Sequence, residues 1–247
     1  MFKQIRSLAE KFRVNQIKEN FYLNHGLMKS LNLQEYEAKI LFKNNHLDTE
    51  QFYLVKTTEE ALHYSKKLNY QAILKCQVHA GGRGKGHLTS GLKGGIQICK
   101  SKEDIINFSN KMLGFNLITN QTPNEGLLVK NLLISEIIDI KKLFYLAFIL
   151  DRKYQGPVIL ASNEGGVNIE EVSKNQPESL IVEPINILKG LTDENVMNVV
   201  SKLNFSEKER NQAIVHLRKL YNLFLKYDAL QIEINPWAVD SHGKVFI

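Results

Sequence analysis

The chain contains 247 residues, of which 43% are hydrophobic and 23% are charged, with 15 glycines and 5 prolines. This composition excludes a disordered or collagen-like chain, and the length suffices for one large domain or two lobes with a sizeable core. The formal net charge of +6 comes mainly from residues 1–30, which hold six basic and two acidic side chains, so the nearly balanced remainder has no basic surface typical of a nucleic-acid partner.

Residues 1–30 have the pattern of a basic amphipathic helix. Their apolar residues recur at spacings of three and four, with lysines and arginines on the opposite face: Phe2, Ile5, Leu8, Ala9 and Phe12. The pattern resembles an organellar transit peptide, although two glutamates and little serine depart from that type. We expect either a transit peptide, with the protein in the mitochondrial matrix or a related organelle, or a solvated N-terminal helix.

From residue 31 onward, helix and strand periodicities alternate, which predicts an α+β or α/β body without internal repeats. Helices are expected over 35–44, 57–68 with a Thr57 cap, 103–113 with a Ser101 cap, 194–203 and 207–226. Strands are expected over 52–55, 72–78, 127–136, 144–150, 158–161, 230–234 and 245–247, with Pro236 ending the strand over 230–234.

The most apolar stretch, 127–150, contains five charged residues and is too polar to span a membrane. No membrane partner is therefore expected. Two cysteines, Cys76 and Cys99, are too few for a disulfide framework or a four-ligand zinc site, which favours a reducing compartment.

A glycine-rich loop follows the strand expected over 72–78. Four glycines surround Arg83 and Lys85, so backbone N–H groups are free to surround an anion while the two cations neutralise it. The loop is not a Walker A motif, because Gly86 follows Lys85 where a serine or threonine would bind magnesium. We predict a site for a phosphate chain, and a flexible hairpin tip is the alternative.

An acid and two amides are expected on one face of the strand near residue 233. The two-residue period of a strand places Gln231, Glu233 and Asn235 on the same side. Such oxygen ligands suit Mg²⁺ that is held mainly by substrate phosphates. A solvated strand face would show the same pattern, so the residues alone leave both interpretations open.

Seven separated motifs together resemble the nucleotide-binding part of the β subunit of succinate–CoA ligase. They are LQEY at 33–36, KCQVHAGGRGKG at 75–86, SGLKGG at 90–95, QTP at 121–123, GP at 156–157, EGGVNIE at 164–170 and EINP at 233–236. The resemblance implies an ATP-grasp fold, in which two lobes hold a nucleoside triphosphate. By analogy, residues 51–132 would form the smaller lobe, and residues 31–50 with 133–247 the larger one.

The resemblance also implies roles for the residues around the glycine loop. Lys75 matches the family lysine that contacts the α and β phosphates, where a point charge on a flexible stem is useful. Gly82, Arg83 and Gly84 match the loop that closes over the triphosphate. Glu50 stands where the family tends to have proline in ATP forms and glutamine in GTP forms, and a carboxylate there can accept from guanine, which favours GTP.

Four further residues match family positions outside the loop. Glu136 resembles an acid near the purine and ribose, and Asp139 lies in the segment that links the lobes. Asn235 resembles a magnesium ligand, and Glu233 resembles the acid that meets the phosphohistidine loop of a partner α subunit, which makes it the candidate catalytic residue.

The activity implied by the resemblance needs a heterodimer with that α subunit. A histidine of the α subunit would attack the γ phosphate of ATP or GTP, the phosphohistidine would phosphorylate succinate, and CoA would displace phosphate from the succinyl phosphate. Mg²⁺ is the implied cofactor. The share of this chain would be positioning and charge neutralisation, as expected for phosphoryl transfer.

Three departures from the family leave other functions open. Leu143 stands where the family has an acid, residue 247 comes just before an expected magnesium-binding aspartate, and the family's C-terminal flavodoxin-like domain has no counterpart in this sequence. We therefore expect the 247-residue chain alone to be catalytically inactive. The alternatives are a subunit of another acid–CoA ligase, such as a malate-using one, and a non-catalytic nucleotide-binding protein derived from the ligase.

Overall fold

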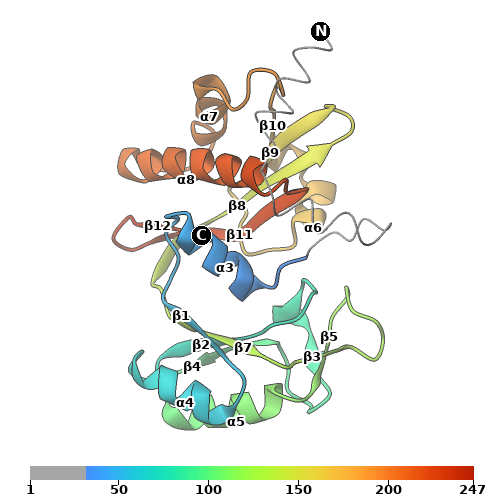
Figure 1. Cartoon of the computed structure of the whole chain (residues 1–247), viewed down its shortest axis with the longest axis vertical. Coiled ribbons are helices and arrows are strands. Elements are labelled where there is room, and N and C mark those ends of the chain that lie inside the picture. Colours follow the sequence, from blue (N-terminus) through green and yellow to red (C-terminus); the bar gives the residue numbers. More distant parts are fainter. Residues whose placement is uncertain (1–31) are drawn as a thin grey trace, which may run out of the picture. The chain divides into compact units, whose positions relative to one another are not determined.

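The computed structural model describes residues 32–247 (Figure 1). The expected transit peptide or N-terminal helix at residues 1–30 lies outside the described residues. The rest of the chain divides into two compact units, which we call the N-terminal unit, Leu31–Asp139, and the C-terminal unit, Ile140–Ile247. No helix in the part that the structure describes is long and apolar enough to cross a membrane.

The N-terminal unit contains a four-stranded antiparallel sheet in the order β1-β7-β2-β4. The strands are β1 (Phe52–Val55), β2 (Ala72–Cys76), β4 (Ile96–Cys99) and β7 (Leu132–Glu136). A smaller sheet joins β3 (His87–Leu88), β5 (Asn116–Ile118) and β6 (Leu127–Leu128). The helices are α3 (Glu35–Asn44), α4 (Thr58–Lys66), α5 (Lys102–Met112) and the short 3₁₀ helix η1 (Arg83–Lys85).

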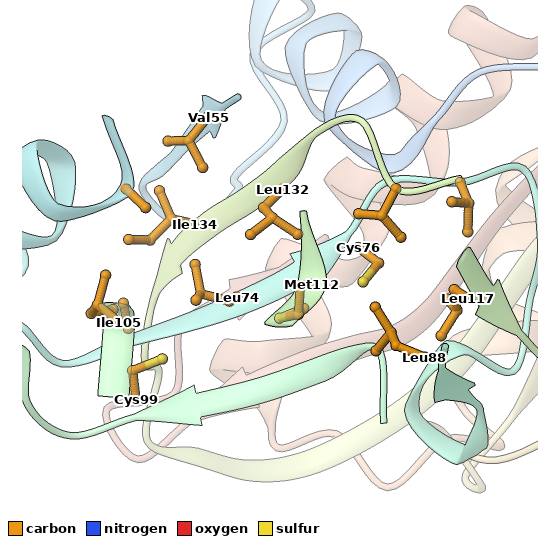
Figure 2. Packing of buried hydrophobic residues seen from close by; sticks show 14 of the residues in the cluster. Val55, Leu74, Cys76, Leu88, Cys99, Ile105, Met112, Leu117, Leu132 and Ile134 are labelled. Atoms are coloured by element: carbon orange, nitrogen blue, oxygen red, sulfur yellow. The ribbon is translucent and has the colours of Figure 1, made fainter. Parts of the chain in front are cut away.

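The core of this unit lies between the four-stranded sheet and the helices α4 and α5 (Figure 1). Leu74 and Ile134 from the sheet and Ile105 and Met112 from α5 are fully buried in it (Figure 2). Alternate residues of β2 therefore face the helices, and Lys75 points to the opposite face of the sheet.

Both cysteines belong to this core rather than to a reactive site. Cys76 and Cys99 are buried and not bonded to each other. Burial raises the pKa of each thiol to about 12, so both stay protonated at neutral pH.

The C-terminal unit contains a five-stranded antiparallel sheet in the order β10-β9-β8-β11-β12. The strands are β8 (Ile140–Asp151), β9 (Gly156–Ser162), β10 (Leu180–Pro184), β11 (Gln231–Asp240) and β12 (Val245–Phe246). The helices are α6 (Ile169–Asn175), η2 (Pro177–Ser179), α7 (Asp193–Val200) and α8 (Glu207–Lys226). The long helix α8 packs on β8, β11 and β12 (Figure 1).

An aromatic cluster forms the centre of the second core. Trp237 is fully buried, with the rings of Phe144 and Phe205 at centroid distances of 6.4 and 5.1 Å. Its indole N–H donates to Nδ1 of the buried His216 at 3.2 Å, so the one polar atom of the indole is satisfied. This packing fixes β11, the strand that carries Glu233 and Asn235.

The expected α+β class and most elements are confirmed, with three differences. The strand expected over 127–136 is two strands in different sheets, β6 and β7, because the apolar run does not reveal that the chain changes its partner. Pro236 does not end its strand: β11 continues to Asp240, with Pro236 inside an irregularity between Ile234 and Trp237, where proline needs no ladder hydrogen bond. The strands β3, β5 and β10, the helix α6 and the 3₁₀ turns η1 and η2 were not expected.

Residues 31–50 group with residues 51–139 in the N-terminal unit. The physical link is α3, whose Tyr36 N–H donates to Gln77 Oε1 at 3.0 Å just after β2. The lobe boundaries 51–132 and 31–50 with 133–247 remain a prediction about how the family fold is arranged.

We predict that Leu74→Ala lowers the free energy of unfolding of the N-terminal unit by about 2 to 5 kcal/mol, because it opens a cavity in a fully buried position. The matched control is Ile98→Ala, whose side chain is 58% exposed and for which we expect a change within about 0.5 kcal/mol. Hydrogen exchange of the β7 amides measures the effect in this unit, whereas Trp237 fluorescence would report on the other one. Equal effects of the two substitutions would contradict the assignment of the core.

Candidate functional site

The glycine loop after β2 has a fixed backbone. Gly82 has a φ of +68°, a left-handed conformation that favours glycine, and it opens the 3₁₀ turn η1. The carbonyl of Arg83 accepts from the N–H of Gly95 at 2.8 Å, and the carbonyl of Gly86 accepts from the N–H of Gly94 at 2.8 Å. The second glycine cluster thus holds the first in place, which argues against a flexible hairpin tip.

Close packing explains why glycine is needed at two of these positions. A Cβ atom at Gly86 would lie 2.5 Å from the carbonyl oxygen of Ile118, and one at Gly95 would lie within 3.0 Å of the Leu117 side chain. The loop is therefore pressed against β5. A loop held this rigidly presents its backbone groups in a defined direction, as a phosphate site requires.

Lys75 and Arg83, the two cations expected to bind phosphate, both donate to the carboxylate of Glu35. Lys75 Nζ donates to Glu35 Oε1 at 2.9 Å, and Arg83 Nη2 donates to Glu35 Oε2 at 2.5 Å. A second group on the Arg83 guanidinium, Nη1, donates to the carbonyl of Cys76 at 2.8 Å. The side chains of Lys75, Arg83 and Glu35 are each 19% exposed, so the cluster is mostly shielded from water yet still reachable.

Electrostatics keep this carboxylate ionised. Burial would raise the pKa of Glu35, but the charges of Lys75, Arg83 and Lys39 outweigh it and lower the pKa from 4.5 to about 2. Glu35 is therefore an anion at any physiological pH. Its position at the first turn of α3 also favours a negative charge.

Glu50 is part of the same network rather than a freely exposed acid. It is 8% exposed, and its Oε2 accepts from Lys39 Nζ at 2.6 Å. Its other carboxylate oxygen lies 3.7 Å from Lys75 Nζ. The structure therefore brings Glu50, Lys75 and Arg83 into one charged network, while the role of Glu50 in choosing the nucleotide remains a prediction.

A pocket borders the glycine loop on the side of β4. Its cavity volume is about 460 Å³, and its lining consists of three glycines, three basic residues and two residues of β4: Gly84, Gly86, Gly94, Lys85, His87, Lys93, Ile96 and Gln97. Backbone glycines together with basic side chains are the composition expected of an anion-binding surface.

Glu136 and Asp139 lie at the end of the N-terminal unit. Glu136 is the last residue of β7, and its Oε1 accepts from the backbone N–H of Gln51 at 2.7 Å. This bond places the Glu136 carboxylate beside the residue that follows Glu50. Asp139 is the last residue of the unit, and its place in a segment that links the lobes remains a prediction.

Asn235 of the C-terminal unit joins two motifs that are far apart in sequence. Its Oδ1 accepts from the N–H of Gly166 at 2.7 Å, and its Nδ2 donates to the carbonyl of Val167 at 2.9 Å. The loop is also pressed on β8, because a Cβ atom at Gly165 would lie 2.3 Å from the carbonyl oxygen of Phe144. Asn235 therefore holds the loop that leads into α6 through two hydrogen bonds.

Glu233 lies on the exposed face of β11, but neighbouring atoms keep part of the water away from its carboxylate. Gln231 Nε2 donates to Glu233 Oε2 at 2.9 Å, which confirms that the two side chains share a face of β11. Burial raises the pKa of Glu233 above its usual value and the charge of Glu170 adds to the rise, while the Gln231 hydrogen bond opposes it. Such an acid holds its proton to a higher pH than a fully solvated glutamate.

Leu143 lies close to the same loop. The side chain is 37% exposed, and its Cδ1 would be 3.2 Å from a Cβ atom at Gly166. An acid at this position, as the family resemblance leads one to expect, would place a charge beside the loop. Leucine offers only an apolar surface there.

The residues present suit a magnesium ion only if phosphates supply most of its ligands. Among residues 32–247, no group of three or more His, Cys, Asp or Glu side chains is arranged to hold a metal. Asn235 Oδ1 uses one lone pair on Gly166, and its second lone pair is sufficient for one metal bond. Magnesium at triphosphate sites commonly has one or two protein ligands, so Asn235 fits this limited role.

Sequence reasoning did not give Glu35 a role. Glu35 lies within the LQEY motif, but its partners Lys75 and Arg83 are 40 and 48 residues away, a separation that no local pattern spans. The only signal was that this acid, inside a motif of the resemblance, opens the helix expected over 35–44.

Solved structures define the class of fold. The chain superposes on an ATP citrate lyase from Methanothrix soehngenii with a TM-score of 0.61 and 20% identity, over 87% of this chain and 49% of that one. It superposes on a dinucleotide-forming acetyl-coenzyme A synthetase from Ca. Korarchaeum cryptofilum with a TM-score of 0.55 and 15% identity, over 83% and 85% of the two chains. The TM-scores show a shared α+β fold, and at identities this low the superpositions show the fold alone.

The family follows from the sequence match. Residues 32–239 match the ATP-grasp domain family, and the chain belongs to that family. The predicted ATP-grasp fold is thereby confirmed.

Within the ATP-grasp family, the chain is most informatively compared with three curated relatives of higher sequence identity. The chain is 44% identical to the mitochondrial GDP-forming succinate–CoA ligase β subunit of Bos taurus, over 87% of this chain and 50% of that protein. It is 42% identical to the mitochondrial ADP-forming β subunit of Dictyostelium discoideum and 40% identical to the hydrogenosomal ADP-forming β subunit of Neocallimastix frontalis, over 87% of this chain and 48% and 49% of those proteins. The chain spans about half the length of these relatives.

We predict that Glu35→Gln lowers the stability of the N-terminal unit at pH 7 but much less in acid. A pKa lowered from 4.5 to about 2 corresponds to roughly 3 kcal/mol of stability at neutral pH. This contribution is complete above the unfolded pKa of the carboxyl and is lost as the pH falls toward 2, so the difference between variant and wild type should shrink to about half by pH 3. Hydrogen exchange of the β2 amides at pH 7 and pH 3 measures it.

The control for this prediction is Glu103→Gln, which removes an exposed acid from α5. We expect it to change stability by less than about 0.5 kcal/mol at either pH. A Glu35→Gln effect of the same size at both pH values would show that the carboxylate acts through its shape and not its charge.

Proposed function

We propose that this chain is the nucleotide-binding part of a succinate–CoA ligase β subunit, and that it binds the magnesium complex of ATP or GTP. The observation that carries the proposal is the convergence of Lys75 and Arg83 beside a backbone-fixed glycine loop, in a chain of the ATP-grasp family. The identity of 40 to 44% to β subunits over 87% of the chain supports the choice of reaction.

In this proposal the N-terminal unit neutralises and orients the triphosphate. Lys75 supplies a point charge to the phosphates, and the N–H groups around Gly82 and Gly84 supply hydrogen bonds from a backbone that is already in place. Groups fixed before the ligand arrives stabilise developing charge without reorganisation, which is the main protein contribution to phosphoryl transfer. Glu136 and Asp139 are assigned to the nucleoside end, and Glu50 to the choice of base.

The C-terminal unit contributes the metal ligand and the acid. Asn235 would give one oxygen to Mg²⁺, which would neutralise phosphate charge when bound. Glu233 would meet the phosphohistidine segment of a partner α subunit, and its raised pKa suits it to hold a proton next to an imidazole. Phosphoryl transfer to succinate, and then the attack of CoA on succinyl phosphate that forms succinyl-CoA and releases phosphate, would take place in the assembled heterodimer. Because the phosphorylated histidine of this proposal belongs to the α subunit, this chain without that subunit is proposed to bind nucleotide and not to catalyse the reaction.

Relatives of both nucleotide classes resemble this chain, so the base is proposed on chemical grounds. A Glu50 carboxylate can accept from the N1–H and 2-amino groups of guanine, which favours GTP, although Lys39 already occupies one of its oxygens. The acid substrate is proposed to be succinate, with malate as the alternative.

One observation favours a second candidate function. Leu143 cannot accept a hydrogen bond or bind a metal at a position where an acid is expected, and it lies against the loop that Asn235 clasps. A nucleotide-binding protein of ligase descent that has no catalytic role would tolerate this residue. Nucleotide binding is common to both candidates, and succinyl-CoA synthesis with an α subunit separates them.

We propose an organellar location, the mitochondrial matrix or a related compartment. The basic amphipathic pattern of residues 1–30 supports it, as do the mitochondrial and hydrogenosomal names of the relatives.

We predict that Lys75→Ala weakens binding of Mg-ATP or Mg-GTP at least tenfold while leaving adenosine or guanosine binding within about twofold. The reason is that a phosphate-binding lysine stabilises only ligands that carry phosphates, and about 1.4 kcal/mol corresponds to a tenfold change. Calorimetric titration measures both ligands, and Lys66→Ala, an exposed lysine of α4, is the control. Equal weakening of nucleoside and triphosphate would remove Lys75 from the phosphate role.

We predict that deletion of residues 1–30 abolishes organellar import and changes the thermal stability of the remaining chain by no more than about 0.5 kcal/mol. Import assays with the full and shortened chains, and thermal unfolding of both, test this. A large loss of stability would instead indicate a helix that packs on the folded part.

A further inference from the structure

Glu35 occupies both cations that the proposed function assigns to the triphosphate. Its two carboxylate oxygens accept separately, one from Lys75 at 2.9 Å and the other from Arg83 at 2.5 Å. The carboxylate thus bridges the strand β2 and the turn η1 in the way that one phosphate group would. Its side chain is only 19% exposed.

Glu35, and not Glu50, is the close partner of Lys75 in this network. Glu50 is held by Lys39 at 2.6 Å and is 3.7 Å from Lys75, so Glu35 is the closer of the two acids to Lys75. An anion that replaced Glu35 on Lys75 and Arg83 would find both cations side by side.

Glu35 also differs from an ordinary structural ion pair by its position. It is the first residue of α3, next to the cap Gln34, and not in the middle of a packed element. Side-chain rotation at the end of a helix therefore suffices to release it, without moving β2 or the loop.

We propose that Glu35 is the internal counter-ion of this site, a carboxylate that a polyphosphate must displace from Lys75 and Arg83 in order to bind. The inference rests on the proposed function and adds a specificity-determining residue to it. Displacement imposes the same cost on every anion. A single phosphate gains few contacts in return, whereas a triphosphate also gains the backbone N–H groups of the loop, so Glu35 selects for polyphosphates.

The decisive experiment is calorimetric titration of wild type and Glu35→Gln with inorganic tripolyphosphate and with inorganic phosphate. Glutamine keeps the shape of the side chain but removes the competing charge. We expect tripolyphosphate to bind the variant about tenfold more tightly, and inorganic phosphate to show binding to the variant only. Glu103→Gln changes the net charge equally on the exposed surface of α5 and should leave both affinities within twofold.

A double-mutant cycle tests whether Glu35 weakens tripolyphosphate binding through its contacts with Lys75 and Arg83. If Glu35 acts by occupying Lys75 and Arg83, the gain from Glu35→Gln should fall to about threefold or less in a Lys75→Ala background, because one of the two cations is gone. An undiminished gain would show that the charge acts at long range and not through these contacts, which overturns the proposed displacement.

Tripolyphosphate binding to Glu35→Gln that is equal to or weaker than wild type, or absent in both, overturns the inference. If Glu35→Gln does not fold, Glu35→Asp decides instead: its shorter carboxylate cannot span both cations, so binding should tighten, and unchanged or weaker binding overturns the inference. The proposed function fails separately, when the wild-type chain binds tripolyphosphate but shows no binding of Mg-ATP or Mg-GTP.

Discussion

The alternation of side chains along β2 is the constraint on which the candidate site depends. Leu74 and Cys76 are fully buried in the core of the N-terminal unit, so the intervening Lys75 must point to the opposite face of the sheet. A shift of one residue in register would bury the ammonium group and expose the core, at a cost far above the net stability of a domain. The hydrophobic core therefore fixes the direction of the lysine that the proposed function uses.

A lysine placed in this way needs a partner until a ligand arrives. Its side chain is 19% exposed, and an unpaired cation at that depth would lose hydration without compensation. Glu35 provides the pairing from α3, and this explains why residues 31–50 group with residues 51–139. The same ion pair also connects α3 to the sheet.

Much of the N-terminal unit was predictable because its signals are local. The helix Glu35–Asn44 and the strand Phe52–Val55 were predicted with the observed bounds, and Thr57 and Ser101 accept from backbone N–H groups as expected of helix caps. The split between β6 and β7 was not predictable in this way, because Leu127–Leu128 and Leu132–Glu136 are equally apolar and differ only in the sheet that they join. The Glu35 contacts were missed for the same reason: they depend on partners 40 or more residues away.

The candidate metal ligand shows how one residue can serve structure and chemistry together. Asn235 was predicted from strand alternation and from resemblance, but its bonds to Gly166 and Val167 were not, and they make it part of the framework of the loop before α6. An aspartate at this position would lack the Nδ2 donor and leave the Val167 carbonyl without that bond. An asparagine satisfies both loop groups and still retains an oxygen lone pair. The loop therefore selects an amide, and any metal bound there must obtain most of its negative charge from the phosphates.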